Sequence, residues 1–319
     1  MVNGEYLDIY KQMVLIRHLE EKAAELYQAG KVGGFLHLYI GEEAVSTGIL
    51  AAREERDHVI TAYRDHGVAV NAGIPVNQIV AELMGKATGI SKGRGGSMHM
   101  ADITRNFWGG HAIVGAHIPI ATGLALADKM EKRDAVTICM FGEGATNIGF
   151  FHEGVNMAMV WKLPVLWICE NNQYGMGTSP ERASAVSNII QKACGYGMPA
   201  YDVDGMDVLA VRDIVAARLQ EIREGSGPQF VEARTYRFKG HSMGDPERYR
   251  SKDEVKKYVE NGPIDRFRKF LIQKEGVQEK RLDEIDEEAA QEIMEAVEFA
   301  DNSPEPADED LFRNIYVEE

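Results

Sequence analysis

The sequence lacks the cysteine patterns of a zinc site or of a disulfide framework. Its three cysteines, Cys139, Cys169 and Cys194, are far apart and form no CxxC or zinc-type spacing. Cys139 and Cys169 lie inside apolar runs, which favours buried core positions over roles as metal ligands or nucleophiles. So few scattered cysteines are typical of a protein of the reducing cytosol.

Long hydrophobic runs are also absent. No stretch approaches the roughly 18 apolar residues that a membrane-spanning helix needs. The first residues, MVNGEYLDIYKQM, have neither the basic start nor the apolar block of a signal peptide. We therefore expect a soluble, cytoplasmic protein without a membrane partner.

Basic residues are in deficit, with 35 Lys and Arg against 50 Asp and Glu, for a net charge of −15. An acidic chain repels polyanions, so nucleic-acid binding is disfavoured and a small cofactor or a protein partner is favoured. The 319 residues, 45% of them hydrophobic, suffice for one large α/β core or two modest domains.

Short apolar segments alternate with helical patterns along much of the chain. Strands are predicted at 58–63, 135–142, 165–171, 200–205 and 229–238, and helices at 6–29, 41–52, 74–85, 117–133, 150–161 and 207–225. This alternation predicts a parallel sheet covered on both faces. Positions 63, 142, 171 and 237 fall at strand ends, where such sheets bind ligands, so we expect one shared site.

Two further regions fall outside this alternation. The glycine-rich passage 86–111 shows no periodicity and is predicted to be a functional loop. After the segment GHSMGDPERYRSK, residues 240–252, the sequence is charged and helical, with amphipathic stretches near 252–275 and 279–301. The acidic segment 301–319 indicates a solvated tail or a partner-facing edge.

The segment FGEGATN, residues 141–147, ends a predicted strand and precedes a helix. As a dinucleotide-binding loop it lacks the third glycine at the required place, although Glu170 ends the next strand about where an acid would bind a ribose. Alternatively, Glu143 and the pair Asn171 and Asn172 meet at adjacent strand ends and hold magnesium, which prefers oxygen ligands. A purely structural alternative makes Glu143 a helix cap and the asparagines a turn.

The spacing from GEG to ENN resembles the thiamin-diphosphate motif, and the segment FGEGATNIGFFHEGVNMAMVWKLPVLWICENNQYGMGTS resembles the α subunit (E1) of two-component 2-oxoacid dehydrogenases. Similar motifs run along the chain: GGFLHLYIGEEAVSTG, HVITAYRDHG, GRGGSMHM, NFWGGHAIVGAHIPIATGLALA, YDVDGMDV and TYRFKGHSMGDPERYR. TAYRDHG, ENNQYGMGTS and HSMGDP look most like the pyruvate-specific members, while HLYIGEEAV and GKATG also resemble the acetoin-cleaving members.

The resemblance implies an α/β thiamin-diphosphate-binding fold: a mostly parallel sheet with helices on both faces and a helical C-terminal extension. It implies a single E1 α domain over residues 1–319. Within it, 1–57 form the N-terminal helices, 58–240 the parallel α/β core, and 241–319 the active-site loop and the C-terminal helices.

For the metal, the resemblance makes Glu143, Asn172 and the backbone carbonyl of Tyr174 the Mg²⁺ ligands. It places Gly144 and Ala145 against the diphosphate of the cofactor. Most pyruvate-type members have Asp at the position of Glu143, whereas branched-chain members have Glu. One extra methylene can still reach the metal.

For the phosphates, the resemblance assigns Tyr63 and Arg64 to the terminal phosphate. An arginine suits this role because its planar guanidinium donates two hydrogen bonds to phosphate oxygens. Arg237 is expected at the same mouth, holding phosphate or carboxylate. His241 is also among the expected cofactor-binding residues.

For the reacting end, His37 and His241 match active-site histidines that face the reactive carbon and the substrate carboxylate. Histidine can donate to developing negative charge and move protons near neutral pH. Ala112 and Val114 correspond to positions that contact the aminopyrimidine. His111 departs from the family pattern, and the sequence assigns it no role.

The activity that the resemblance implies is decarboxylation of a 2-oxoacid, first of all pyruvate, as in the acetyl-transferring pyruvate dehydrogenases, with transfer of the acyl group to a lipoyl-bearing E2. No glutamate here matches the one that activates the cofactor, so an E1 β subunit, in an α2β2 heterotetramer, is expected to supply it. Acetoin-cleaving and branched-chain specificities stay open, as do an NAD-binding dehydrogenase and a non-catalytic scaffold. Ser242 matches a serine that is phosphorylated in some relatives.

Overall fold

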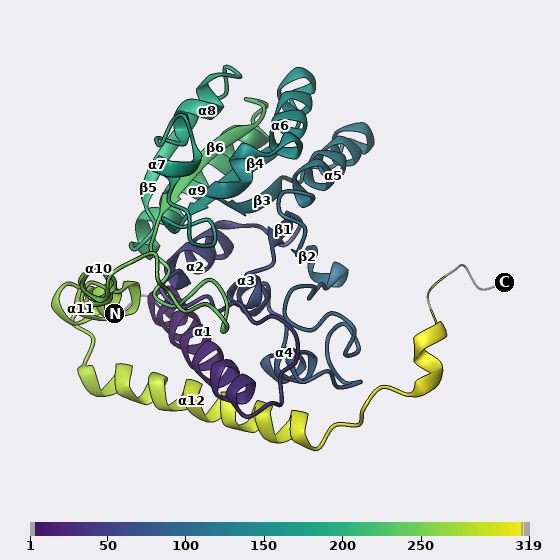
Figure 1. The fold of residues 1–319 in the computed structure, drawn as a ribbon. Coiled ribbons are helices and arrows are strands. Elements are labelled where there is room, and N and C mark those ends of the chain that lie inside the picture. The colour runs from purple at the N-terminus through teal and green to yellow at the C-terminus, as the bar shows by residue number, and fades with distance from the viewer. Residues whose placement is uncertain (1–3, 314, 316–319) are drawn as a thin grey trace.

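A computed structural model describes residues 4–313 and 315. In this part of the chain six strands form one parallel sheet in the order β2-β1-β3-β4-β6-β5 (Figure 1). The strands are β1 (His58–Ala62), β2 (Phe107–His111), β3 (Thr137–Gly142), β4 (Val165–Asn171), β5 (Ala200–Asp204) and β6 (Gln229–Arg234). The expected α/β fold with a parallel sheet is confirmed.

Helices cover both faces of this sheet, because successive side chains of each strand point to opposite sides. On one face Ile138 and Met140 pack in a core with α1 (Gly4–Gln28), α2 (Glu43–Ala52), α3 (His66–Asn71), α4 (Val76–Leu83) and α9 (Val208–Arg223). On the other face Cys139, Phe141 and Trp167 pack against α5 (His117–Glu131), α6 (Gly149–Trp161) and α8 (Ile190–Cys194). Cys139 and Cys169 are buried core residues, as predicted.

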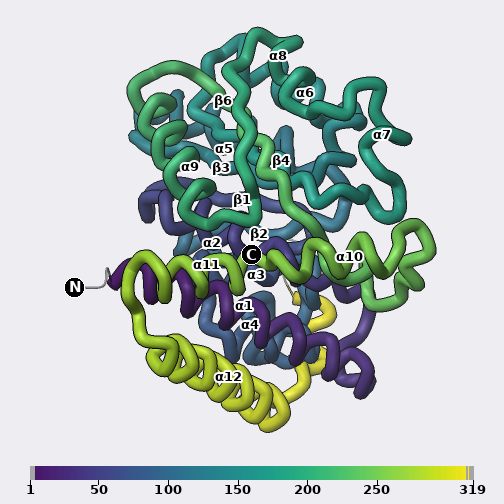
Figure 2. The backbone as a smooth tube through the Cα atoms, turned by 90° about the vertical axis from the view of Figure 1, so that its left-hand side faces the viewer, coloured from purple at the N-terminus to yellow at the C-terminus, as the bar shows by residue number. Residues whose placement is uncertain are grey.

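The C-terminal helices lie beside the N-terminal ones (Figures 1 and 2). The stretch 252–275 divides into α10 (Lys252–Val259) and α11 (Pro263–Gln273), because Gly262 and Pro263 interrupt it. α12 (Glu279–Asp301) packs along α1 and α4, and the chain then extends to η3 (Asp308–Phe312), where the Asp310 carbonyl accepts a hydrogen bond from Arg94 at 2.7 Å. No helix of the described residues is both long and apolar enough to cross a bilayer.

The glycine-rich passage 86–111 is more regular than its sequence suggests. It contains η1 (Ile103–Arg105) and the edge strand β2, which the sequence FWGGH does not reveal because it lacks alternation. The buried carboxylate of Glu82 accepts backbone N–H groups of Ser91, Gly93, Gly95 and Gly96 at 2.7–3.0 Å. The Glu82 carboxylate therefore provides hydrogen-bond acceptors for backbone N–H groups that have no helix or strand partner.

Other differences from the sequence-based expectation concern short elements. The helices α3, α7 (Pro180–Ala183) and α8 span too few residues to show a period. The strand expected at 229–238 ends at Arg234 as β6. Beyond it the chain leaves the sheet, since the Phe238 N–H donates to the carbonyl of Ile40 in the loop before α2.

The close packing of α2 on α9 gives a test of the fold. A Cβ at Gly48 would lie 2.8 Å from the Val208 carbonyl oxygen and 2.8 Å from Val211 Cβ. We expect Gly48→Ala to destabilise the protein by about 1–3 kcal/mol through overpacking, measured by denaturant unfolding. Ala51→Ser, at an exposed position of the same helix, should cost no more than about 0.5 kcal/mol; equal stability of both variants would contradict this packing.

Candidate functional site

A pocket of about 820 Å³ opens at the carboxyl end of the sheet. All twelve residues that the family resemblance assigned to the site line it: His37, Tyr63, Arg64, Ala112, Val114, Glu143, Gly144, Ala145, Asn172, Tyr174, Arg237 and His241. They come from six separate segments, most of them at the ends of β1, β2, β3 and β4 or in the loop that follows β6. The sequence-based expectation of one shared site is therefore met in its geometry, while the role of each residue stays a prediction.

The ends of β3 and β4 bring an acid and an amide together. These strands pair in parallel with Gly142 opposite Glu170, so Glu143 and Asn172 both follow at the same edge. The two loops meet closely: a Cβ at Gly175 would lie 3.4 Å from Glu143 Oε1. Asn171 does not join them, since its Nδ2 donates to Glu232 Oε1 at 2.7 Å and it does not line the pocket.

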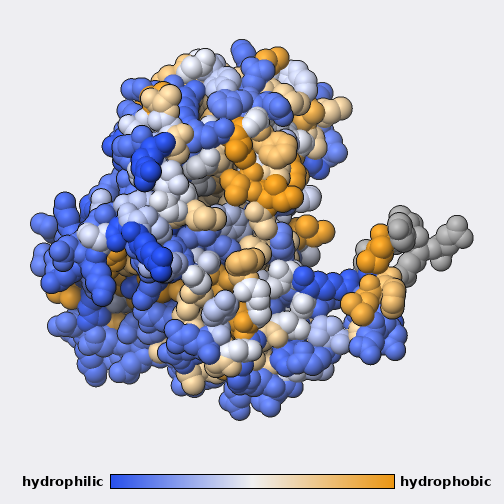
Figure 3. All heavy atoms as spheres, viewed as in Figure 1, coloured by the Kyte–Doolittle hydropathy of each residue, from blue (hydrophilic) through white to orange (hydrophobic). Residues whose placement is uncertain are grey.

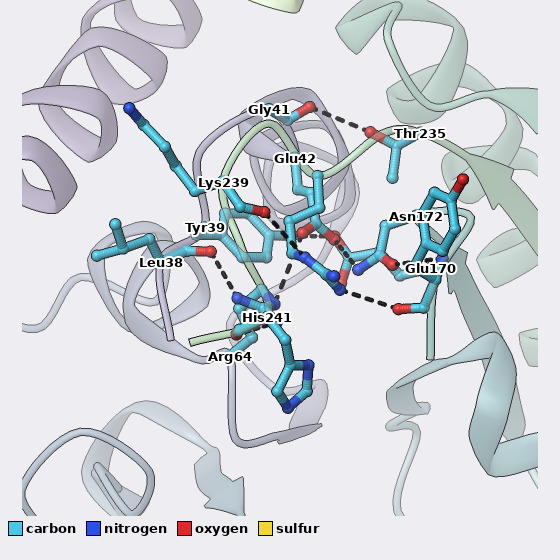
Figure 4. Close-up of polar contacts among 12 residues, drawn as sticks. Leu38, Tyr39, Gly41, Glu42, Arg64, Glu170, Asn172, Thr235, Lys239 and His241 are labelled. Atoms are coloured by element: carbon cyan, nitrogen blue, oxygen red, sulfur yellow. Dashed lines mark hydrogen bonds and ion pairs between the residues drawn. The ribbon is translucent and has the colours of Figure 1, made fainter. Parts of the chain in front are cut away.

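Arg64, two residues beyond the end of β1, is buried and anchored by backbone carbonyls (Figure 4). Its Nη1 donates to the carbonyl of Leu38 at 2.7 Å, and its Nη2 donates to the carbonyl of His241 at 3.0 Å. Its Nε also forms a loose ion pair with Glu42 Oε1, 3.6 Å away. The guanidinium is thus oriented and remains available to an anion.

Arg237, beyond the end of β6, is a second buried guanidinium. It donates to the carbonyls of Tyr174 and Met176, both at 2.9 Å, and to the hydroxyl of Tyr249 at 2.9 Å. Burial and the neighbouring Arg64 lower its pKa. The carbonyl of Tyr174 keeps a second lone pair, so the contact with Arg237 does not exhaust it as an acceptor.

Three carboxyl groups face the two guanidiniums, and the family resemblance assigned only one of them, Glu143, to the cofactor site. Burial raises the pKa of Glu143 to about 7 and raises the pKa values of Glu42 and Glu170. Glu170 receives a hydrogen bond from the hydroxyl of Tyr39, so the acid that a dinucleotide would need for its ribose is already engaged. Glu42 sits at the start of α2 in the motif GEEAV, which the sequence presented only as the beginning of a helix.

Three rings form the floor of the pocket near Arg64. The ring centroid of His37 lies 4.6 Å from that of Tyr63 and 5.0 Å from that of His241. Burial, followed by the charge of Arg64, lowers the pKa of His37 to about 3 and that of His241 to about 4. The Nδ1 atoms of both histidines are buried without a hydrogen-bond partner among the described residues, so both neutral rings can exchange hydrogen bonds with a ligand.

His111 does not line the pocket. Its ring stacks on His117, with centroids 5.9 Å apart and planes inclined by 20°. His117 does line the pocket, and its Nε2 lies 2.9 Å from the Met140 carbonyl oxygen, which fixes Nε2 as the protonated nitrogen because a carbonyl can only accept. His111 therefore acts on the site through a neighbour at most.

Known proteins share this sequence almost end to end. The family model for the dehydrogenase E1 component matches residues 11–309. The chain is 44% identical to the pyruvate dehydrogenase E1 component subunit alpha of Rickettsia bellii, over 99% of this chain and 97% of the relative. It is 47% identical to the protein of the same name from Rhizobium meliloti (98% and 90%) and 46% identical to that from Zymomonas mobilis (98% and 89%).

The lowered histidine pKa values predict a pH dependence. An unfolded histidine titrates near 6.5, whereas His37 and His241 titrate at about 3 and 4 in the fold, so the folded state binds fewer protons between these values. Their contribution to stability is therefore present above about pH 7 and is lost as the pH falls through 6 toward 4. His37→Gln should flatten this decline in unfolding free energy.

Ring-proton NMR titration provides the direct measurement, with His37→Gln and His241→Gln to assign the signals. We expect both rings to remain neutral at pH 5.5. A midpoint near 6.5 for either ring would contradict the burial of these side chains.

Proposed function

The chain belongs to the dehydrogenase E1 component family, and on this basis we propose that it is the α subunit of an E1 that decarboxylates pyruvate with thiamin diphosphate and Mg²⁺. Thiamin diphosphate use is implied by the family itself. The names of the relatives support pyruvate. The observation that carries the proposal is the pocket at the sheet edge, around which all twelve expected site residues gather.

The residues at the β3 and β4 ends fit a metal. Mg²⁺ prefers oxygen ligands and needs few from the protein when phosphates supply others. Glu143 offers a carboxyl group whose pKa is raised to about 7 by burial, and a cation bound beside it would favour its charged form. We assign the metal to Glu143, to Asn172 Oδ1 and to the Tyr174 carbonyl. Gly144 and Ala145, which line the pocket beside Glu143, are assigned to the diphosphate.

The two guanidiniums and the hydroxyl-bearing ring of Tyr63 fit the phosphate end. Arg64 and Arg237 are positively charged groups held rigidly by backbone carbonyls, an arrangement suited to an anion that must be bound in one orientation. Ala112 and Val114, which also line the pocket, provide backbone groups and an apolar wall, assigned to the aminopyrimidine.

When bound, thiamin diphosphate supplies a thiazolium that stabilises the carbanion left by loss of carbon dioxide. The chain's own part is to hold the cofactor and to keep His37 and His241 neutral beside the reacting groups. A neutral imidazole donates a hydrogen bond to the carboxylate or keto oxygen of the substrate from one ring nitrogen. Positioning of this kind is what the ring cluster with Tyr63 provides.

The family implies an E1 β partner and a 2-oxoacid substrate. The rim of the pocket supports a partner there: Phe35, Val114 and Met176 line the pocket, yet 68%, 45% and 66% of their surface is exposed. We propose that the β subunit covers this rim and supplies the glutamate that activates the cofactor. The α2β2 arrangement and the transfer of the acyl group to a lipoyl domain of E2 are parts of the same proposal.

Apolar surface also extends over the adjacent helices. Figure 3 shows it gathered over α5 and α6 on the face turned to the viewer. The exposed apolar side chains of these two helices are Ile120 and Met130 on α5 and Phe150, Met157, Val160 and Trp161 on α6. Exposed apolar surface of this extent beside a pocket is typical of a protein interface, and we assign it to the assembled complex.

The metal assignment has a direct test in the complex of this chain with its β subunit. We expect Glu143→Ala to weaken thiamin diphosphate binding at least about 100-fold, because a ligand to the metal is lost, and Glu143→Asp to bind within about tenfold of the wild type. Calorimetric titration measures both. Unchanged affinity in Glu143→Ala would refute the assignment.

An activity assay of the assembled enzyme identifies the substrate. Pyruvate should support dye reduction only with thiamin diphosphate and Mg²⁺ present, and should exceed acetoin and branched-chain 2-oxoacids. A preference for either of those would move the protein to another specificity. A melting temperature raised by NAD and not by thiamin diphosphate would favour a dinucleotide enzyme, and no response to either would favour a scaffold.

The proposed interface predicts the effect of a surface charge. Val160→Asp places a carboxylate at a side chain that is 68% exposed on α6, and burying that charge against a partner should weaken assembly at least about tenfold. Met294→Asp, on α12 and 51% exposed, is the matched control and should assemble normally. Analytical ultracentrifugation with the β subunit gives the measurement, and equal assembly of both variants would remove α6 from the interface.

A further inference from the structure

Glu42 is a fully buried acid that does not cap the helix at whose start it lies. It stands at the N-terminus of α2, yet its side chain makes no capping hydrogen bond to that helix. The carboxylate instead lines the pocket, between Arg64 and Asn172 (Figure 4). Its neighbour Glu43 is buried as well but performs an ordinary structural task, because it accepts from Arg17 at 2.7 Å and from the Gly41 N–H at 3.0 Å.

The contacts of Glu42 fix the orientation of an amide. Asn172 Nδ2 donates to Glu42 Oε2 at 3.0 Å. A carboxylate can only accept hydrogen bonds, so it selects the amide orientation in which the NH₂ group faces Glu42 and the oxygen faces away. On that other side Asn172 Oδ1 has one long contact, 3.4 Å from the Tyr174 N–H, which leaves the oxygen accessible.

The second oxygen of Glu42 faces the guanidinium of Arg64, with 3.6 Å between Oε1 and Nε, and has no hydrogen-bond partner among the described residues. One carboxylate thus spans the space between the strand end that carries the amide and the strand end that carries the arginine. Burial of an acid lowers the stability of the fold unless its interactions with neighbouring groups compensate for the lost hydration.

We propose that Glu42 is a positioning residue of the cofactor site, which turns the Asn172 oxygen toward the metal position and steadies Arg64 for the diphosphate. The inference rests on the proposed function, since it gives the metal to Asn172. Glu42 acts through the amide, because its Oε2 atom accepts a hydrogen bond from the Asn172 NH₂ group. Outer-sphere groups that orient a ligand commonly change metal affinity by about 10–100-fold.

Three variants of the assembled complex test this: Glu42→Ala, Glu42→Gln and the control Glu43→Gln. The measurement is the apparent Mg²⁺ dissociation constant at saturating thiamin diphosphate, by calorimetric titration of metal-stripped protein. We expect an increase of about tenfold or more in Glu42→Ala. Glu42→Gln keeps an acceptor for the Asn172 amide, so its Mg²⁺ dissociation constant should lie within about threefold of the wild-type value. Glu43→Gln should lower the melting temperature and leave the Mg²⁺ constant unchanged, which separates positioning from folding.

Wild-type affinity in Glu42→Ala would overturn the inference and leave the proposed function standing. An equal loss in Glu42→Ala and Glu42→Gln would also overturn it, because negative charge and not amide orientation would then be what matters. If Glu42→Ala fails to fold, Glu42→Gln and Glu43→Gln still decide, since an effect of Glu43→Gln on the Mg²⁺ constant as large as that of Glu42→Gln contradicts a specific role. A wild type that binds neither Mg²⁺ nor thiamin diphosphate would overturn the proposed function and this inference together.

Discussion

The architecture of the pocket depends on the buried guanidinium of Arg64. Its N–H groups must be satisfied inside the protein, because an unpaired buried charge costs several kcal/mol. They find the carbonyl of Leu38, in the loop before α2, and that of His241, in the loop after β6. One of these carbonyls belongs to His241 and the other to Leu38, which follows His37 in the chain. The hydrogen bonds of Arg64 therefore help to position both histidines.

The same pocket contains groups whose hydrogen-bonding capacity is not used. Oε1 of Glu42 and Nδ1 of both His37 and His241 are buried without partners among the described residues. Buried polar atoms of this kind lower stability, and native proteins keep few of them. These three atoms border the same cavity as two guanidiniums, and a polar ligand bound there would provide their missing hydrogen-bond partners.

The sequence predicts the sheet and the strand-end residues well for a physical reason. Buried parallel strands are continuous apolar runs, and whatever follows them must meet at one edge, so the sequence alone suffices to bring Glu143 and Asn172 together. The strand β2 was not predicted, because its two glycines interrupt the pattern of apolar residues. The role of Glu42 was not predicted because Asn172, its partner, is 130 positions away in sequence. The strand pattern placed position 63 at the site, but only the resemblance to a family gave roles to Tyr63, Arg64 and the histidines.

Assembly and cofactor binding are coupled in the arrangement proposed here. The chain supplies the charges, the oxygen ligands and the neutral rings, all of them deep in the pocket, while apolar side chains such as Phe35 and Met176 remain exposed at the rim. In the proposed complex, a cofactor bound between these layers contacts this chain at its diphosphate and near His37 and His241, and contacts the partner at the glutamate that activates it. By linkage, a partner that raises the affinity of this chain for the cofactor must have its own affinity for this chain raised by the cofactor by the same factor, so assembly and cofactor binding stabilise one another.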